Sequence, residues 1–287
     1  MDEPLRCYRH PDRETLVSCS DCGRGICPDC MNFGPVGIRC PEHASSTGVP
    51  AKKRAQITAR KTRASFSRSG PVVTFSLITL NIGVFLVQLL MGAALGTTDT
   101  GWIYEHGVLV SSAVDSSGQV VGVAEGEWWR LLTATFLHGN LLHLGMNMLV
   151  LWIIGPPLEE YFGRGRYALV YLVSGLAGSA GALIVSGGAP TVGASGAIWG
   201  IMGAAVLLEA RRIYVFGGQA MGLVVFNLVI TFLIPGISIG GHIGGLIGGG
   251  VCALVFASLR RTPTLATLSV AAVGALSVAI AVSQVQL

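Results

Sequence analysis

Charged residues are scarce in this chain of 287 residues: Asp, Glu, Lys and Arg together make up 12% of it. Aromatic residues are also few, at 7%, whereas hydrophobic residues as a class reach 51% and the mean hydropathy is +0.64. Soluble globular domains carry about 25% charged residues, so the composition excludes an ordinary member of that class. It indicates an integral membrane protein.

The sequence also lacks a basic N-terminal stretch followed by an apolar run, so we expect no cleavable signal peptide. Residues 1–70 contain 12 of the 19 Lys and Arg residues. This enrichment is typical of a segment that stays in the cytoplasm, and it indicates membrane orientation rather than a nucleic-acid partner.

Beyond Pro71, the apolar part of the chain divides into seven segments, each near the ~20 residues that cross a bilayer as a helix. They lie at 72–92, 131–154, 167–186, 192–210, 213–234, 237–258 and 264–284. With a cytoplasmic N-terminus, the cytoplasmic connections contain Arg164 and Arg166, Arg211 and Arg212, and Arg260 and Arg261, as the positive-inside rule requires. We therefore expect an all-α polytopic membrane domain over 71–287 with its C-terminus outside. We find no inverted repeat, which weakens a transporter hypothesis without excluding it.

The second segment contains three polar residues that are costly in a membrane, His138, His143 and Asn147. His143 and Asn147 are four residues apart and share one side of a helix, so they can act together. His138 faces away from Asn147 and is expected to pack the outside loop. An ordinary interhelical hydrogen bond is the alternative role for the pair.

The fourth segment opens with Gly193-Ala194-Ser195-Gly196, directly after a loop that contains Pro190. Ser195 is therefore expected in the first helical turn, where backbone N–H groups lack partners within the helix and favour an anion. Serine beside glycines is also common on helix-packing faces, so a purely structural role stays open.

The sixth segment has a single ionisable side chain, His242, beside a stripe of glycines at positions 241, 245 and 249. Such a stripe predicts the close approach of another helix, and the fourth segment, with Gly196 and Gly200, is the expected partner. This pairing would bring Ser195 Oγ within hydrogen-bonding reach of His242.

A serine becomes a nucleophile when a base takes its proton, and a neutral imidazole does this near pH 7. We therefore predict a catalytic Ser195–His242 dyad. No acidic residue occurs in the sixth segment or beyond, so Trp199 is expected to stack on the imidazole in place of a carboxylate. His143, Asn147 and the Ser195 N–H are the expected oxyanion hole.

Together with Trp129-Arg130, His138-Gly139-Asn140 and Gly241-His242-Ile243-Gly244-Gly245, these residues resemble the rhomboid family of intramembrane serine proteases over about 71–284. The resemblance implies a six-helix core, with Ser195 as nucleophile, His242 as base and then acid, and His143 and Asn147 in the oxyanion hole. Trp199 departs from the tyrosine that is frequent there, and Gly241 from an alanine. The segment 264–284 is an additional seventh helix with no expected catalytic role.

The first 43 residues contain four pairs of potential metal ligands, Cys7, His10, Cys19, Cys22, Cys27, Cys30, Cys40 and His43. Eight such ligands suit two tetrahedral Zn²⁺ ions, which would stabilise a module too small to fold on its hydrophobic core alone. The spacing leaves sequential pairing, cross-braced pairing and disulfides open. The pattern resembles B-box-type zinc fingers, which implies the cross-braced grouping Cys7, His10, Cys27 and Cys30 against Cys19, Cys22, Cys40 and His43. Between this module and the membrane domain, residues 44–70 form a basic linker. It either binds anionic lipid headgroups or acts only as a signal for membrane topology.

The leading hypothesis is an intramembrane serine endopeptidase that cleaves transmembrane segments through an acyl-enzyme and needs no catalytic cofactor. The resemblance implies single-span membrane proteins as substrates and a multi-pass location, which we place in the plasma membrane. For the zinc module we expect a cytoplasmic protein partner and no nucleic acid. A non-catalytic adaptor that binds membrane proteins and a carrier with the same polar cluster are the alternatives.

Overall fold

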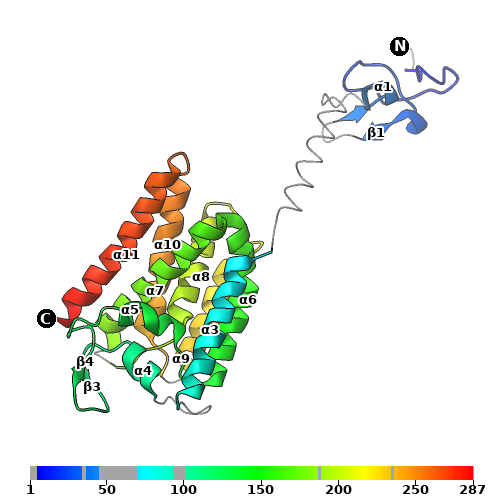
Figure 1. Ribbon diagram of the computed structural model, residues 1–287. Coiled ribbons are helices and arrows are strands. Elements are labelled where there is room, and N and C mark those ends of the chain that lie inside the picture. Colours follow the sequence, from blue (N-terminus) through cyan, green and yellow to red (C-terminus); the bar gives the residue numbers. More distant parts are fainter. Residues whose placement is uncertain are drawn as a thin grey trace. The chain divides into compact units, whose positions relative to one another are not determined.

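The computed structural model describes residues 5–33, 37–44, 70–92, 101–186, 189–233 and 236–286. The chain divides into two compact units, Met1–Ser69 and Gly70–Leu287 (Figure 1). The linker expected at 44–70 lies outside the described residues except at its two ends.

The N-terminal unit is small and has little regular structure. It contains a 3₁₀ helix η1 (Pro28–Cys30), an antiparallel pair of strands β1 (Asn32–Phe33) and β2 (Ile38–Arg39), and a short helix α1 (Pro41–Ala44). Its buried hydrophobic cluster consists of five cysteines and one isoleucine, namely Cys7, Cys19, Ile26, Cys27, Cys30 and Cys40. A core with so few aliphatic groups supplies little hydrophobic stabilisation, so this unit requires another source of stability.

The second unit is a bundle of seven apolar helices within the described residues (Figure 1). They are α3 (Val72–Leu90), α6 (Leu141–Phe162), α7 (Arg164–Ser186), α8 (Ser195–Ala210), α9 (Ala220–Leu233), α10 (Ile239–Ser258) and α11 (Pro263–Val285). All except α8 and α9 are long and apolar enough to cross a membrane, whereas α8 has 16 residues and α9 has 14. The predicted all-α polytopic fold is confirmed, but two of the seven segments are shorter than expected.

The second helix begins ten residues later than the expected start at residue 131. The apolar run there first forms two short elements, α5 (Arg130–Thr133) and the 3₁₀ helix η2 (Ala134–Phe136). Helix α6 then starts after Asn140, whose side chain caps it by accepting from His143 N at 2.8 Å. The helix continues through Pro156 and Pro157 to Phe162, so the expected end at 154 was also wrong.

The fifth helix begins seven residues later than expected because a turn precedes it. The carboxylate of Glu209, near the end of α8, accepts hydrogen bonds from Phe216 N, Gly218 N and Ala220 N. These contacts fix the chain between α8 and α9 and satisfy a donor at the start of α9. Helix α9 is consequently only about 20 Å long.

Helix α10 lies between α7 and α8 and contacts both through glycine. A Cβ built on Gly245 would lie 2.8 Å from the carbonyl carbon of Gly196, and one on Gly249 would lie 2.5 Å from Gly200 Cα, both in α8. On its other side, Cβ atoms on Gly244 and Gly248 would crowd Ala177 of α7. The predicted pairing of the fourth and sixth helices is present, and the close packing on α7 is an additional finding.

Glu159 fastens the first helix to the second. This buried carboxylate in α6 accepts from Val73 N at 2.9 Å and from both the N–H and the hydroxyl of Thr74 at 2.8 Å. The two backbone donors belong to the first turn of α3, where N–H groups have no acceptor within the helix. The seventh helix, α11, packs on α7, with Gly274 facing Val173.

Candidate active site

Ser195 is the first residue of α8, as the sequence indicates. The loop before it is tied to other parts of the unit: Thr191 pairs with Leu109 through two backbone hydrogen bonds, and Gly193 N donates to Ala134 O at 2.9 Å. Gly193 has a φ of +125°, a backbone conformation that side chains disfavour. The loop therefore holds Ser195 at a helix N-terminus, where backbone donors face any developing anion.

His242 lies in the first turn of α10, which Ser238 caps by accepting from Gly241 N. Its imidazole is buried and stacks on the Trp199 ring, with a centroid separation of 4.8 Å and an interplanar angle of 21°. The predicted stacking partner of His242 is therefore present. Because the α8 and α10 backbones meet at Gly196 and Gly245, the first turns of the two helices are adjacent.

The hydrogen bond expected between Ser195 and His242 is not formed in this geometry. Within the described residues, Ser195 Oγ has no hydrogen-bond partner, and its side chain is only partly buried. Catalytic hydrogen bonds are often long in ligand-free sites and tighten when substrate binds. The structure thus places the helices that carry Ser195 and His242 side by side, without a hydrogen bond between the two side chains.

His143 and Asn147 lie beside the loop that precedes Ser195. A Cβ built on Gly193 would lie 2.6 Å from His143 Nε2 and 3.8 Å from Asn147 Nδ2. The absence of a side chain at Gly193 therefore gives both groups access to the loop two residues before the serine. Asn147 Nδ2 donates one hydrogen to His143 O at 2.9 Å and keeps a second one for another acceptor.

His138 was expected to pack the outside loop, but it is buried and its ring and backbone contact His143 and Gln88. Its ring makes an edge contact with His143, with centroids 5.1 Å apart, and neither ring nitrogen has a hydrogen-bond partner in the described structure. Its backbone pairs with the side chain of Gln88 in α3 through two hydrogen bonds. His138 therefore packs against His143 and joins α3 to the start of α6.

Thr231 of α9 is a polar contact of His242 that the sequence analysis did not identify. Its Oγ1 lies 2.8 Å from His242 Nδ1 and donates to Asn227 O at 2.9 Å. Asn227 and Thr231 are polar residues four apart in an apolar segment, which is the signal that singled out His143 and Asn147. The spacing alone marks both as polar residues in an apolar helix, and only the fold shows that the Thr231 hydroxyl contacts His242.

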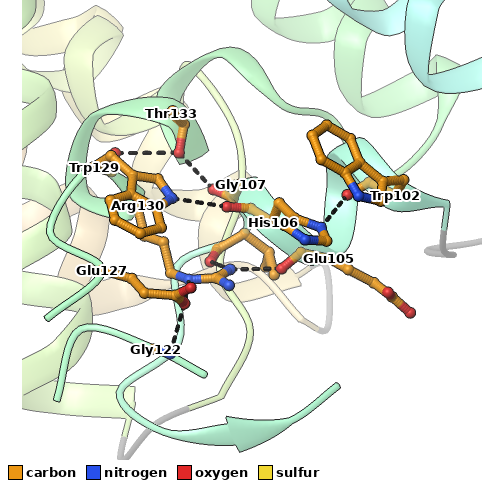
Figure 2. Close-up of polar contacts among 10 residues, drawn as sticks. Trp102, Glu105, His106, Gly107, Gly122, Glu127, Trp129, Arg130 and Thr133 are labelled. Carbon is orange, nitrogen blue, oxygen red and sulfur yellow. Dashed lines mark hydrogen bonds and ion pairs between the residues drawn. The ribbon is translucent and has the colours of Figure 1, made fainter. Parts of the chain in front are cut away.

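The loop between α3 and α6 is fixed by a buried arginine, shown in Figure 2. Arg130 Nε donates to Glu127 at 2.6 Å, and its Nη1 donates to the carbonyls of Glu105 and Val108 at 2.6 and 2.9 Å. Glu105 belongs to helix α4 (Trp102–Gly107). The indole N–H of Trp129 also donates a hydrogen bond to this helix, at His106 O. One side chain therefore joins several turns of this loop into a single structure.

A small hairpin extends from the same loop. Strand β3 (Ala113–Val114) pairs with β4 (Val120–Val121), and Asp115 closes the turn between them. Hydrogen bonds from the Ser117 hydroxyl and the Gln119 N–H hold the pKa of the Asp115 carboxyl below its usual range.

The N-terminal unit brings its eight potential metal ligands into two groups. Cys7, His10, Cys27 and Cys30 form one, and Cys19, Cys22, Cys40 and His43 form the other, with all ligand atoms of a group within 4.8 Å of one another. His10 Nδ1 lies 3.4 to 3.7 Å from the three sulfurs of its group. A tetrahedral ion with Zn–S bonds of about 2.3 Å separates its ligands by roughly 3.8 Å, so both groups fit such an ion. Each group can hold a metal ion, and the grouping is cross-braced rather than sequential.

Comparison with known proteins gives the family. The rhomboid domain matches residues 125–259, a range that includes Ser195, His242, His143 and Asn147. The rhomboid protease GluP of Bacillus subtilis is 37% identical over 195 residues, which cover 66% of this chain and 36% of GluP. The putative rhomboid protease YdcA of the same organism is 34% identical over 141 residues, covering 46% of this chain and 69% of YdcA. RHOMBOID-like protein 2 of Arabidopsis thaliana is 39% identical over 132 residues, covering 44% and 42%.

The match to GluP thus spans about a third of that protein's length. The domain match begins at residue 125 and leaves out the N-terminal unit. The helical bundle, the domain match and the match to YdcA over two thirds of its length all indicate the same family. The chain is a multi-pass membrane protein of the rhomboid family.

Proposed function

We propose that this chain is an intramembrane serine endopeptidase, with Ser195 as its nucleophile and His242 as its general base. The observation that carries the proposal is the Trp199-stacked imidazole of His242, in the first turn of α10, packed against the first turn of α8 where Ser195 lies. His242 takes the serine proton as Oγ attacks the scissile carbonyl, and then gives that proton to the leaving amine. Water then attacks the acyl-enzyme with His242 as its general base, and His242 returns the proton to Ser195 Oγ as the carboxylic acid leaves.

The negative charge that develops on the carbonyl oxygen requires donors in a dry site. The Ser195 N–H, the second Nδ2 hydrogen of Asn147 and the His143 ring are suited to this role, because the two side chains lie beside Gly193, two residues before Ser195. Each such donor contributes about 3 kcal/mol to transition-state stabilisation.

For the N-terminal unit we propose two structural Zn²⁺ ions in a B-box-type module. Thiolate and imidazole ligands with no carboxylate favour Zn²⁺ over Mg²⁺ or Ca²⁺. The ions provide stability that the cysteine-rich core lacks, and catalysis does not involve them. A cytoplasmic protein partner remains our prediction for this module.

The proposed orientation has the zinc module in the cytoplasm and the C-terminus outside, at the plasma membrane. Basic pairs after α6, α8 and α10 support it. The substrates proposed are single-span membrane proteins, in keeping with the word protease in the names of GluP and YdcA.

The test is labelling by a serine-directed fluorophosphonate in native membranes, because it requires no known substrate. We expect the intact chain to be labelled, and Ser195→Ala and His242→Ala to abolish labelling. Thr267→Val, which removes an exposed hydroxyl on α11, is the control and should label normally. Equal labelling of Ser195→Ala and the intact chain would refute the nucleophile assignment, and no labelling of folded protein would favour a non-catalytic adaptor.

A further inference from the structure

The hydroxyl of Thr231 is placed to determine which nitrogen of His242 carries the proton. Thr231 is one of only three buried residues in α9, and its Oγ1 contacts both His242 Nδ1 and Asn227 O, at 2.8 and 2.9 Å. Neither contact involves Ser195, Trp199 or the oxyanion candidates. Among the described residues, it is the one side-chain hydrogen bond of the imidazole.

A hydroxyl has one hydrogen to donate and two lone pairs to accept with. The hydrogen of Thr231 is directed to the Asn227 carbonyl, so the oxygen is left to accept from His242 Nδ1. Both contacts are hydrogen bonds at once only if Nδ1 carries the imidazole proton. In the other tautomer, the hydroxyl would have to turn toward Nδ1 and give up its bond to Asn227.

From this geometry we infer that Thr231 is the positioning residue for His242, holding the neutral imidazole in the Nδ1–H tautomer with Nε2 unprotonated. The inference rests on the proposed function, because it matters to catalysis only if His242 is the base. An unprotonated Nε2 is the nitrogen that can remove the Ser195 proton. The hydrogen bonds of Thr231 are to Asn227 and His242, so it acts through His242 rather than on Ser195.

The same contact continues to act after proton transfer. When Nε2 has taken the Ser195 proton, the ring is cationic and its Nδ1–H still donates to Thr231 Oγ1. A hydrogen bond from a charged donor is stronger than one from a neutral donor, so the contact stabilises the imidazolium more than the resting imidazole. Thr231 thus takes the place that an aspartate has in a serine protease triad, without contributing a charge.

The first test compares three variants by their rate of fluorophosphonate labelling in membranes. Thr231→Val keeps the shape of the side chain and removes the acceptor, and we expect it to label roughly 10- to 100-fold more slowly than the intact chain. Thr231→Ser keeps the hydroxyl and should retain a rate near that of the intact chain. The control Thr267→Val removes a helical hydroxyl that donates to Pro263 O far from His242, and it should change nothing.

A purely structural role for Thr231 would not give this pattern. If it only packed α9 against α10, Thr231→Ser would lose a buried methyl group and suffer more than the near-isosteric Thr231→Val. Normal labelling of a folded Thr231→Val variant would likewise overturn the inference.

The second test needs neither activity nor a folded variant at position 231. The chain has six histidines, and ¹⁵N-histidine labelling with His242→Ala for assignment identifies the His242 signals. The inference requires the chemical shifts of a protonated Nδ1 and an unprotonated Nε2 in the intact chain, at a pH where the ring is neutral. A protonated Nε2 would refute it even if the protein is an active protease. An Nδ1–H tautomer in a chain that does not label would instead retain the positioning role and refute the proposed function.

Discussion

Replacing Gly249 with alanine should separate α8 from α10 and slow the proposed reaction at the other end of the helix. A Cβ at this position would lie 2.5 Å from Gly200 Cα and would overlap the Gly200 carbonyl, whereas real Cβ atoms essentially never come within 3.0 Å of another atom. All of these neighbours are backbone atoms, so no side chain can turn away. The helices would have to part by about 1 Å, as in other overpacked cores.

The expected magnitude follows from that displacement. Overpacking costs about 1–3 kcal/mol of stability, against which the better helix propensity of alanine restores up to ~1 kcal/mol. A displacement of about 1 Å between reacting groups can reduce a rate about 100-fold. We therefore expect a modest fall in thermal stability and a large fall in Ser195 labelling.

The neighbouring glycine provides a matched control. A Cβ on Gly250 would lie 3.8 Å from Gly203 O, which is an ordinary van der Waals contact, so Gly250→Ala should be neutral or slightly stabilising. Both variants would be measured in the same detergent by thermal unfolding and in membranes by fluorophosphonate labelling. Equal behaviour of the two variants would show that the glycine contact does not set the distance between α8 and α10.

Three further predictions concern parts of the chain away from the helix contact. Glu159→Gln should reduce the free energy of unfolding by about 1–3 kcal/mol and lower the unfolding temperature, because an amide oxygen replaces a carboxylate that accepts three hydrogen bonds. An unchanged unfolding temperature in detergent would contradict this. Arg130→Lys should destabilise the loop around α4 by about 1.5–3 kcal/mol, because a lysine keeps the charge but loses guanidinium hydrogen bonds to Glu127 and two carbonyls. Limited proteolysis should then cut this loop faster than in the intact chain, and an unchanged cleavage rate would contradict the prediction. Strong chelators should unfold the N-terminal unit, and elemental analysis should show the loss of two zinc ions per chain. An N-terminal unit that stays ordered without metal would count against the zinc sites. Deleting residues 1–43 should leave labelling of Ser195 intact.

The positions of the membrane helices could be predicted from apolar runs, but their ends could not. Residues 131–136 are as apolar as a helix interior and yet form the short elements α5 and η2. Hydropathy does not predict this, because the ends of a helix depend on specific hydrogen bonds. Asn140, a good N-cap residue, was the local signal for the true start of α6. The late start of α9 depends on Glu209, whose three acceptor contacts exist only in the folded turn.

Of the candidate site, the glycine spacing predicted which helices meet. It did so because glycines repeated every four residues lie on one face of a helix and let another backbone approach that face closely. The second glycine face of α10, toward α7, passed unnoticed in a segment so rich in glycine. Thr231 was missed for a different reason: threonine is neutral and common in apolar helices, and only the fold places its hydroxyl against His242.

The absence of acidic residues after Glu209 is consistent with a hydroxyl as the third member of the proposed site. A carboxylate beside His242 would have to be stripped of water in a buried position, and an isolated charge there is expensive unless it is fully paired. A threonine oxygen that already donates to a backbone carbonyl accepts the Nδ1 hydrogen without introducing a charge. It also stabilises the imidazolium less than an aspartate would. The stacked indole of Trp199 compensates in part, since an aromatic face attracts a cation most strongly when both are desolvated. On this argument, Thr231 selects the tautomer and Trp199 stabilises the charged ring, so the two roles that one aspartate combines in a triad are divided between two neutral side chains.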